Sequence, residues 1–176
     1  MQVCFGPIRE VPVRAYFVRQ GGLAAADSAA ARELELAKAY EAFTGAPGQV
    51  ACVRDYRSGG ASVFVGLGDA PDPETVRRGM DKLTAWAEGQ RIARLGVSAA
   101  GLSGGQVRGA AEGAVMAAYR YTPYLTVKPE RALEEVVIQA EAEALAEGRE
   151  GVVLGTAVNI ARDLVNEPSN VQTPLR

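Results

Sequence analysis

Apolar side chains recur at strand-like spacing in several separate stretches of the chain. We expect strands at residues 11–18, 49–55, 61–67, 92–97 and 133–138. Pro12 stands near the start of the first, which suits a first or edge strand because proline cannot donate a ladder hydrogen bond. Turn-forming residues at 56–60 join the second stretch to the third. Their number and type predict a β-hairpin.

Between these strands the apolar positions follow helical spacing. We expect helices at residues 28–44, 73–89, 104–121, 141–147 and 151–165. In the first, Leu36, Tyr40 and Phe43 share one face, which is predicted to be buried. Ser28 can cap its start, and Gly45 is placed to end it.

The helix expected at residues 73–89 has the clearest signals. Asp72 is a natural N-cap, and Pro73 fits the first helical position because the N–H that it lacks would have no partner there. Its buried face is expected to hold Val76, Met80, Leu83 and Ala87. Gly89 marks its end.

Glycines at every fourth position interrupt the helix expected at residues 104–121. Gly105, Gly109, Gly113 and Ala117 form one stripe. Each internal glycine costs roughly 1 kcal/mol relative to alanine. A regular stripe of missing side chains therefore predicts the close approach of another backbone along that face.

The last helix is apolar over a wide arc. Two adjoining stripes hold Val153, Ala157, Ile160 and Leu164, and Leu154, Val158, Ala161 and Val165. A helix of this kind is normally buried on more than one side. The acidic, alanine-rich stretch before it is expected to end at Gly148. The order of strands and helices predicts an α/β fold, in which helices flank a mixed β-sheet on both faces.

Composition limits the chemistry that the chain can carry. It has 176 residues, no histidine, and a net charge of -2 from 19 basic and 21 acidic residues that are mixed along the sequence. The absence of histidine excludes Ser-His-Asp and Cys-His centres and histidine zinc sites within the chain. The charge argues against nucleic-acid binding. Cys4 and Cys52 lie in apolar segments and do not indicate a disulfide framework.

Targeting signals are not evident. The first residues lack a secretory signal, and no apolar run approaches the length of about 18 residues that a membrane span needs. We therefore expect a soluble, cytoplasmic protein.

Three motifs could carry chemistry, and each has a simpler structural interpretation. Residues 102–106, Leu-Ser-Gly-Gly-Gln, match the signature of ABC-type ATPases, but the chain has no Walker A loop, which leaves a glycine-rich helix start with some anion affinity. Residues 66–68, Gly-Leu-Gly, lack the rest of a dinucleotide fingerprint. An acidic cluster is typical of a solvated surface and comprises Glu134, Glu135, Glu141, Glu143 and Glu147.

The segment 159–174 closely resembles the junction between the two domains of leucyl aminopeptidases. The family pattern is Asn-x-Ala-Arg-Asp-Leu-x-Asn-x-Pro-x-Asn-x-x-Thr-Pro. It agrees with this chain at Asn159, Ala161, Arg162, Asp163, Leu164, Asn166, Pro168, Asn170, Thr173 and Pro174. Leucine is more usual where Ile160 and Gln172 stand, and these departures concern packing only. Residues 45–49, 65–68, 111–113 and 118–121 are similar to weaker family landmarks in the same order.

This resemblance implies a macrodomain-like N-terminal α/β domain at residues 1–150. Residues 151–176 would then be the connecting helix and the start of a catalytic domain. In the family that domain holds two divalent metals, zinc or manganese, which activate water and polarise the peptide carbonyl. Its metal ligands lie in glycine-rich motifs that do not occur here, so no catalytic, cofactor-binding or metal residue is carried over to this chain. The implied role is non-catalytic, in assembly and active-site access of an aminopeptidase that forms hexamers.

A second hypothesis from another class remains open. A macrodomain-like chain could be a free-standing nucleotide or ADP-ribose binding module, although only the glycine-rich turns at residues 66–68 and 101–105 favour it. Under the first hypothesis the partners are the catalytic domain, further copies of the chain and, for the parent enzyme, its peptide substrate, with no nucleic acid or membrane. Because of its two apolar stripes, the last helix is expected to leave one face uncovered and to promote a dimer or trimer.

Overall fold

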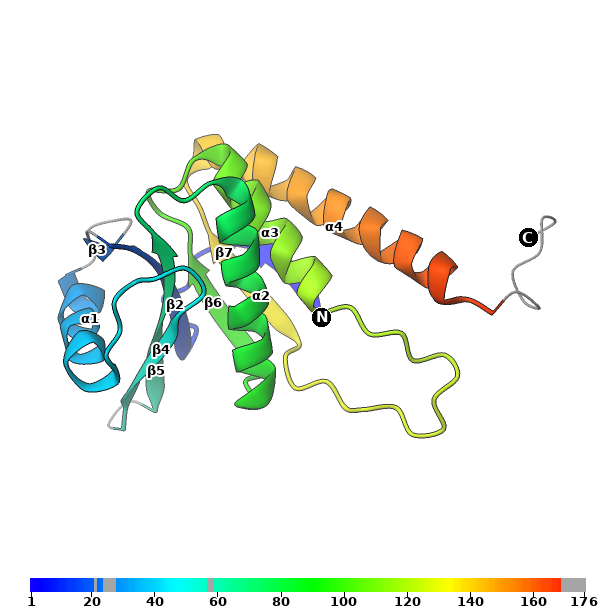
Figure 1. Cartoon of the computed structure of the whole chain (residues 1–176), viewed down its shortest axis with the longest axis horizontal. Helices are drawn as coiled ribbons and strands as arrows, with labels where there is room; N and C mark the ends of the chain where they lie inside the picture. The colour runs from blue at the N-terminus through cyan, green and yellow to red at the C-terminus, as the bar shows by residue number, and fades with distance from the viewer. Residues whose placement is uncertain (21, 24–27, 57–58, 169–176) are drawn as a thin grey trace.

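The computed structural model describes residues 1–20, 22–23, 28–56 and 59–168 (Figure 1). In chain order its elements are β1 (Gln2–Phe5), β2 (Val13–Arg19), β3 (Gly22–Leu23), α1 (Ser28–Glu41), β4 (Val50–Asp55), β5 (Gly60–Gly68), α2 (Pro73–Gly89), β6 (Arg94–Ser98), α3 (Gly104–Ala117), β7 (Glu135–Gln139), the short 3-10 helix η1 (Ala142–Ala144) and α4 (Leu145–Asn166).

The strands form one mixed sheet in the order β1-β7-β6-β2-β5-β4, and β3 pairs with the end of β2. β1, β7, β6, β2 and β5 run parallel to one another, whereas β4 is antiparallel to β5. The expected hairpin is confirmed as β4 and β5, with Val50 opposite Val65. β1, which the sequence pattern did not predict, forms one edge of the sheet.

β2 lies in the middle of the sheet, between β6 and β5, so the prediction of a first or edge strand is wrong. Pro12 is compatible with this position because it precedes the strand, and its carbonyl accepts a hydrogen bond from the Ala61 amide at 3.0 Å. Ala15 and Phe17 are buried in one core cluster, and Tyr16 and Val18 in another. Such burial on both faces is typical of a strand inside a covered sheet.

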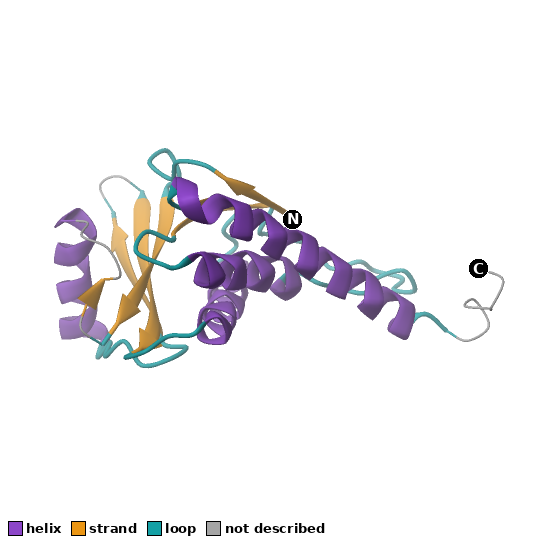
Figure 2. Cartoon of the chain, turned by 90° about the horizontal axis from the view of Figure 1, so that it is seen from above, coloured by secondary structure: helices purple, strands orange, loops and turns teal. Residues whose placement is uncertain are grey.

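Helices cover both faces of the sheet, as predicted. α1 packs on one face against Tyr16 and Phe64, while α2 and α3 pack on the other, where the larger core contains Phe17 and Val65. α4 lies outside α3 and projects beyond the sheet (Figures 1 and 2). The expected fold class is therefore confirmed.

α1 differs from its prediction in length and in the face that it buries. It ends at Glu41 because Ala42 takes a left-handed conformation with φ of 50°, before Gly45 is reached. Its buried residues are Ala30, Leu34 and Ala37. Leu36 and Tyr40, which were expected on the buried face, are exposed, whereas Phe43 is buried beyond the helix end. Small alanines allow the helix to lie close to the aromatic rings of the sheet, which explains this choice of face.

α2 confirms the predicted cap and buried face. The Asp72 carboxylate accepts a hydrogen bond from the Thr75 amide at 2.7 Å, and Pro73 is the first helical residue. Val76, Met80, Leu83 and Ala87 are fully buried.

The glycine stripe of α3 lies against α2, as predicted. A Cβ at Gly109 would stand 2.3 Å from the carbonyl oxygen of Pro73, and one at Gly113 would stand 2.5 Å from that of Arg77. These distances are too short for any side chain. α3 itself ends at Ala117, earlier than expected, and an extended loop follows (residues 118–134, hereafter the α3–β7 loop).

α4 is one continuous helix where the sequence suggested two. Gly148, which was expected to end the first, lies inside α4. A Cβ at this position would be 2.7 Å from the Phe5 ring, so glycine is needed there for packing and not for a turn. Residue 150, the expected domain boundary, falls within this helix, and the start of a second domain remains a prediction.

Candidate functional site

The outer half of α4 and the α3–β7 loop form an arm that leaves the body of the domain (Figures 1 and 2). Residues 159–167 of the junction segment lie on this arm, and residues 169–174 of that segment lie outside the described part of the chain. We define the arm as residues 156–167 together with the loop at residues 118–134. The helical part of the arm has one side that faces α3, one that faces the loop and one that faces outward.

Before the arm begins, glycines fix α4 to α3. A Cβ at Gly151 would be 2.3 Å from the carbonyl oxygen of Arg108, and one at Gly155 would be 3.1 Å from that of Glu112. α3 thus has α2 along one side and α4 along another, each at backbone contact distance. The direction of the arm is set by this packing.

The polar residues of the junction motif bind the end of α3 and the loop that follows it. The Asn159 side chain donates to the Val115 carbonyl at 3.0 Å, and Arg162 donates to the Met116 carbonyl at 3.1 Å. These carbonyls belong to the last turn of α3, where regular helical hydrogen bonds run out, although the Met116 carbonyl also accepts from the Tyr119 amide at 3.2 Å. The motif therefore caps α3 from a neighbouring helix.

Tyr119 lies at the centre of a second set of contacts. Its hydroxyl donates to Asp163 at 2.9 Å and accepts from Asn166 at 3.1 Å, and the Arg162 guanidinium lies 5.5 Å from the centre of its ring. Burial raises the pKa of the Tyr119 phenol, and the adjacent Asp163 carboxylate acts in the same direction. Three residues of the motif thus surround one tyrosine.

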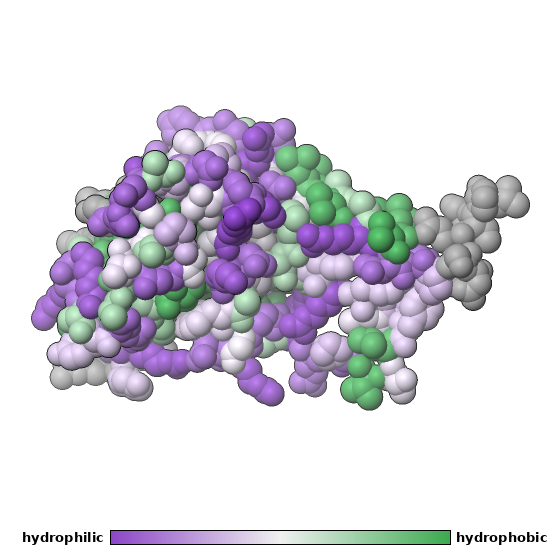
Figure 3. All heavy atoms as spheres, in the orientation of Figure 1, coloured by the Kyte–Doolittle hydropathy of each residue, from purple (hydrophilic) through white to green (hydrophobic). Residues whose placement is uncertain are grey.

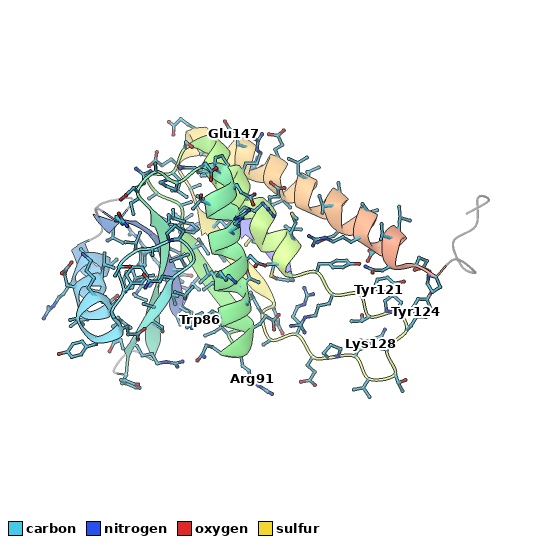
Figure 4. All side chains as sticks on the ribbon, viewed as in Figure 1. Trp86, Arg91, Tyr121, Tyr124, Lys128 and Glu147 are labelled. Carbon is cyan, nitrogen blue, oxygen red and sulfur yellow. The ribbon has the colours of Figure 1, made fainter. Side chains whose placement is uncertain are left out.

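Two further tyrosines hold the end of the arm. The hydroxyls of Tyr121 and Tyr124 donate to the two carboxylate oxygens of Glu167 at 2.6 and 2.9 Å, and the two rings are 6.1 Å apart (Figure 4). Burial raises the pKa of Tyr121, and the hydrogen-bonded Glu167 carboxylate raises it further. We call this arrangement the tyrosine latch. Sequence reasoning did not assign it a role, although tyrosines at 119, 121 and 124 were a visible signal.

The outward face of α4 is apolar and exposed. Val153, Ile160 and Leu164 belong to one predicted stripe, Leu154 and Val165 to the other, and their exposed fractions range from 41% to 84%. Figure 3 shows the apolar atoms gathered along this edge. The expectation that the helix leaves an apolar face uncovered is confirmed. The expectation that one of the two stripes is buried in the domain is wrong, because residues of both stripes are exposed and the buried residues of α4 are Gly148, Gly151 and Gly155. Clustered exposed apolar residues are typical of interaction sites.

The glycine-rich start of α3, at residues 102–106, is filled by the protein itself. The Ser103 amide donates to Gln106 Oε1 at 2.9 Å, and the Gln106 amide donates to the Pro71 carbonyl at 2.6 Å. The Glu147 carboxylate lies beside Gly104, 2.6 Å from where a Cβ would be. The Glu147 carboxylate thus lies at the start of α3, where the sequence suggested that an anion from solution could bind.

The Gly-Leu-Gly segment, residues 66–68, serves packing. A Cβ at Gly66 would be 2.1 Å from the Ala46 carbonyl oxygen. Gln49 organises the facing loop, since its side-chain oxygen accepts from the Thr44 amide at 3.0 Å and from the Ala46 amide at 3.2 Å. Residues 45–49 and 65–68, two of the weaker family landmarks, therefore contact each other in the fold.

The acidic residues considered as metal ligands do not gather. Glu135 pairs with Arg94, and Glu141 accepts from the Gly101 amide at 3.4 Å. Within the part of the chain that the structure describes, no three His, Cys, Asp or Glu side chains are placed to hold a metal ion. Likewise, among the described residues, no helix is long and apolar enough to cross a membrane.

For a nucleotide module, the expected binding place is the carboxyl ends of β2 and β6, where the chain connections diverge. The Arg19 guanidinium lies across this place, with Nη2 3.4 Å from the Gly101 carbonyl oxygen. Its Nε is buried without a partner among the described residues.

Comparisons with known proteins agree on one family. The family model "Cytosol aminopeptidase family, N-terminal domain" matches residues 18–128. A probable cytosol aminopeptidase of Alkaliphilus oremlandii is 33% identical over 126 residues, which make up 64% of this chain and 25% of that protein. Its counterpart in Roseiflexus castenholzii is 39% identical over 72 residues, or 37% of this chain and 15% of that protein. The chain thus spans about a quarter or less of the length of these curated relatives.

Solved structures show the same fold. The bottromycin maturation enzyme BotP has a TM-score of 0.74 and 25% identity, with 93% of this chain and 34% of that chain covered. A structure of BotP in complex with Mn gives a TM-score of 0.73. A tomato leucine aminopeptidase mutant has a TM-score of 0.77 at 20% identity, with 99% of this chain and 40% of that chain covered.

Proposed function

The chain belongs to the cytosol aminopeptidase family, in which it corresponds to the N-terminal domain, and on this premise we propose that it is the non-catalytic domain of a leucyl aminopeptidase. The parent enzyme would release N-terminal amino acids from peptides in the cytoplasm. Its two divalent metals, zinc or manganese, would be held by the catalytic domain. The residues of this chain do not fit that pair of metals, because its described part offers no converging set of ligands.

The observation that carries this proposal is the arrangement of the arm. α3 and the tyrosine latch cover one side of α4. On the other side, Ile160 and Leu164 face outward with more than half of their surface exposed. Residues that match the family junction make the inward contacts. This part of α4 lies in the segment that resembles the family junction, and its outer side is apolar. It is therefore suited to receive the catalytic domain. The domain would thereby serve assembly and shape access to the active site.

An aminopeptidase assay of the chain alone tests the proposal directly. The purified chain, supplied with manganese or zinc, is expected to leave a leucyl amide substrate intact, because its described part has no residues placed to hold the metals. Turnover that a chelator abolishes would contradict a non-catalytic role. The coding sequence that follows Arg176 is a second test. We expect it to contain stretches resembling Gly-x-Thr-Phe-Asp-Ser-Gly-Gly and Asn-Thr-Asp-Ala-Glu-Gly-Arg, and a sequence without them would overturn the assignment.

Titration with ADP-ribose and ATP separates this proposal from the competing one. The Glu147 carboxylate lies beside Gly104 at the start of α3, where it would repel a phosphate group, so we expect no binding in the micromolar range. Micromolar binding of either compound would favour the nucleotide-module hypothesis. A gel shift at low salt is expected to show no tight binding of DNA, in keeping with the net charge of -2.

A further inference from the structure

A cavity of about 490 Å³ opens where the parallel strands β1 and β7 end, beside the first turns of α4. Its size lies within the range of small-molecule sites in proteins. The carboxyl ends of parallel strands are also the usual place for ligands in α/β sheets. Neither the family comparison nor the proposed function assigns a role to it.

One wall of the cavity is apolar and held in place. Phe5, Pro7 and Leu145 contribute to it. The Phe5 ring lies against α4, so close that a Cβ at Gly148 would be 2.7 Å from its Cε1. The backbone beneath is fixed as well, because the Gly6 amide donates to the Ile138 carbonyl at 3.1 Å. The cavity thus offers a preformed apolar surface.

The polar lining is cationic. Arg9 and Arg149 line the cavity, and none of the described residues that line it is acidic. Neither arginine forms an ion pair with any described residue. Gln139 Oε1 accepts from the Ile8 amide at 3.1 Å, a bond that leaves the amide donors of Gln139 unused. Two free guanidinium groups and a side-chain amide therefore stand beside an apolar wall.

A second cavity shows the contrasting case. It has a volume of about 510 Å³ and is lined by Arg120 and Arg131 but also by Glu88 and Glu130. Arg120 lies 3.3 Å from the Glu88 carboxylate, and Arg131 donates to the Ala118 carbonyl. Arg120 thus ties the α3–β7 loop to α2, and Arg131 ties the two ends of that loop together. Arg9 and Arg149 have no such internal use.

We propose that the cavity lined by Arg9 and Arg149 binds a small organic dianion that carries an apolar group, either a phosphate monoester or a dicarboxylate. Guanidinium groups recognise both kinds of anion with paired hydrogen bonds. An amino acid or peptide is disfavoured, since its ammonium group would meet two cations and no carboxylate. The site is therefore distinct from the peptide chemistry proposed for the parent enzyme.

Calorimetric titration of the 176-residue chain at low salt and pH 7.5 tests this, with phenyl phosphate and phthalate as the two probes. We expect at least one of them to bind, and at least tenfold more tightly than inorganic phosphate or leucine. The better probe identifies the chemical class. In the double variant Arg9→Gln/Arg149→Gln, affinity is expected to fall at least tenfold, whereas Arg32→Gln, which removes an exposed arginine from α1, should leave it unchanged.

A second variant keeps both arginines. Leu145→Glu introduces a carboxylate into the lining, four residues before Arg149 on the same helix, where it can pair with that guanidinium. Acidic residues are favourable in the first turn of a helix, so the fold should be retained, and an unchanged melting curve checks this. Affinity should again fall at least tenfold. Absence of binding of both probes at millimolar concentration, or equal losses in Arg32→Gln and the cavity variants, would overturn the proposal.

Discussion

The two halves of α4 meet the rest of the molecule in different ways. Up to Gly155 the helix lies backbone to backbone on α3, and a methyl group at Gly151 would fall 2.3 Å from a carbonyl oxygen. Beyond that point contacts are made by the ends of long side chains, such as Arg162 with the Met116 carbonyl. Backbone contact tolerates no added atom, whereas contact through side-chain ends does. The outward side is exposed in both halves, at Val153 as well as at Ile160. We therefore assign the first half to the folding of the domain and propose that the second half receives a partner.

The largest effect is expected where the backbones touch. Gly151→Ala should lower the free energy of unfolding by about 2–3 kcal/mol, because the new methyl group forces α4 away from α3, and this overpacking outweighs the better helix propensity of alanine. Denaturant unfolding measures the change. Gly89→Ala is the matched control, since a Cβ there meets nothing within 4 Å, and its effect should stay within about 0.5 kcal/mol. Equal stability of the two variants would contradict the assignment of the first half of α4 to folding.

On the outer half, substitution should change association and not stability. In Ile160→Ser/Leu164→Ser both altered side chains are more than half exposed, so unfolding should shift by no more than about 0.5 kcal/mol. We propose that the unmodified chain forms dimers or trimers through this face. The variant should then approach a compact monomer with a radius of gyration of about 16 Å in small-angle scattering.

Tyr40→Ser is the control for that experiment, because Tyr40 is an exposed aromatic residue on α1, on the opposite face of the sheet. It should leave association unchanged. A monomeric mass of the unmodified chain at every concentration would show that the apolar face of α4 does not drive self-association.

The contrast between the two halves also shows what the sequence could predict. α2 was predictable because its cap, its first proline and its apolar face agree. The glycine stripe of α3 was predictable because a spacing of four places every missing side chain on one face of the helix. Gly148, Gly151 and Gly155 carried the same meaning for α4, but their spacing changes from three to four, and Gly148 follows an acidic stretch that resembles a helix end. Local pattern cannot distinguish a glycine that ends a helix from one that touches a neighbour.

Other features depended on tertiary pairing that no local pattern encodes. The central position of β2 is set by its pairing with β5 and β6, and Pro12 suggested an edge because a single strand does not reveal its neighbours. α1 buries Ala30, Leu34 and Ala37 where Leu36 and Tyr40 were expected, because the side of the helix that meets the sheet is set by tertiary packing against Tyr16 and Phe64. The tyrosine latch joins residues more than forty positions apart. Its carboxylate, Glu167, is not one of the matching positions of the junction motif.

A smaller effect is expected from the latch itself. Tyr121→Phe/Tyr124→Phe removes both hydroxyl groups that bind Glu167 and keeps the two rings. Amide hydrogen exchange in residues 122–130 should become several times faster, while the melting temperature stays nearly constant because these contacts lie outside the core. Tyr40→Phe removes an exposed hydroxyl elsewhere and should change neither quantity. Unchanged exchange in the double variant would show that the hydroxyls do not hold the loop.

The smallest effect concerns pH. The pKa of Tyr121 is raised by burial and by the Glu167 carboxylate, so the closed latch holds this proton more tightly than an open one does. The stabilisation is therefore fully present below the ordinary tyrosine pKa of about 10, and it is lost as pH rises through the higher pKa of the closed state. Ultraviolet titration of tyrosinate should show a late phase, at a pH above the ordinary tyrosine pKa of about 10. Tyr121→Phe should remove part of this late phase and leave a remainder from Tyr119, whose pKa is also raised. A late phase that persists in full in Tyr121→Phe would mean that the latch does not govern this proton, and that the end of the arm is held by the Tyr119 contacts alone.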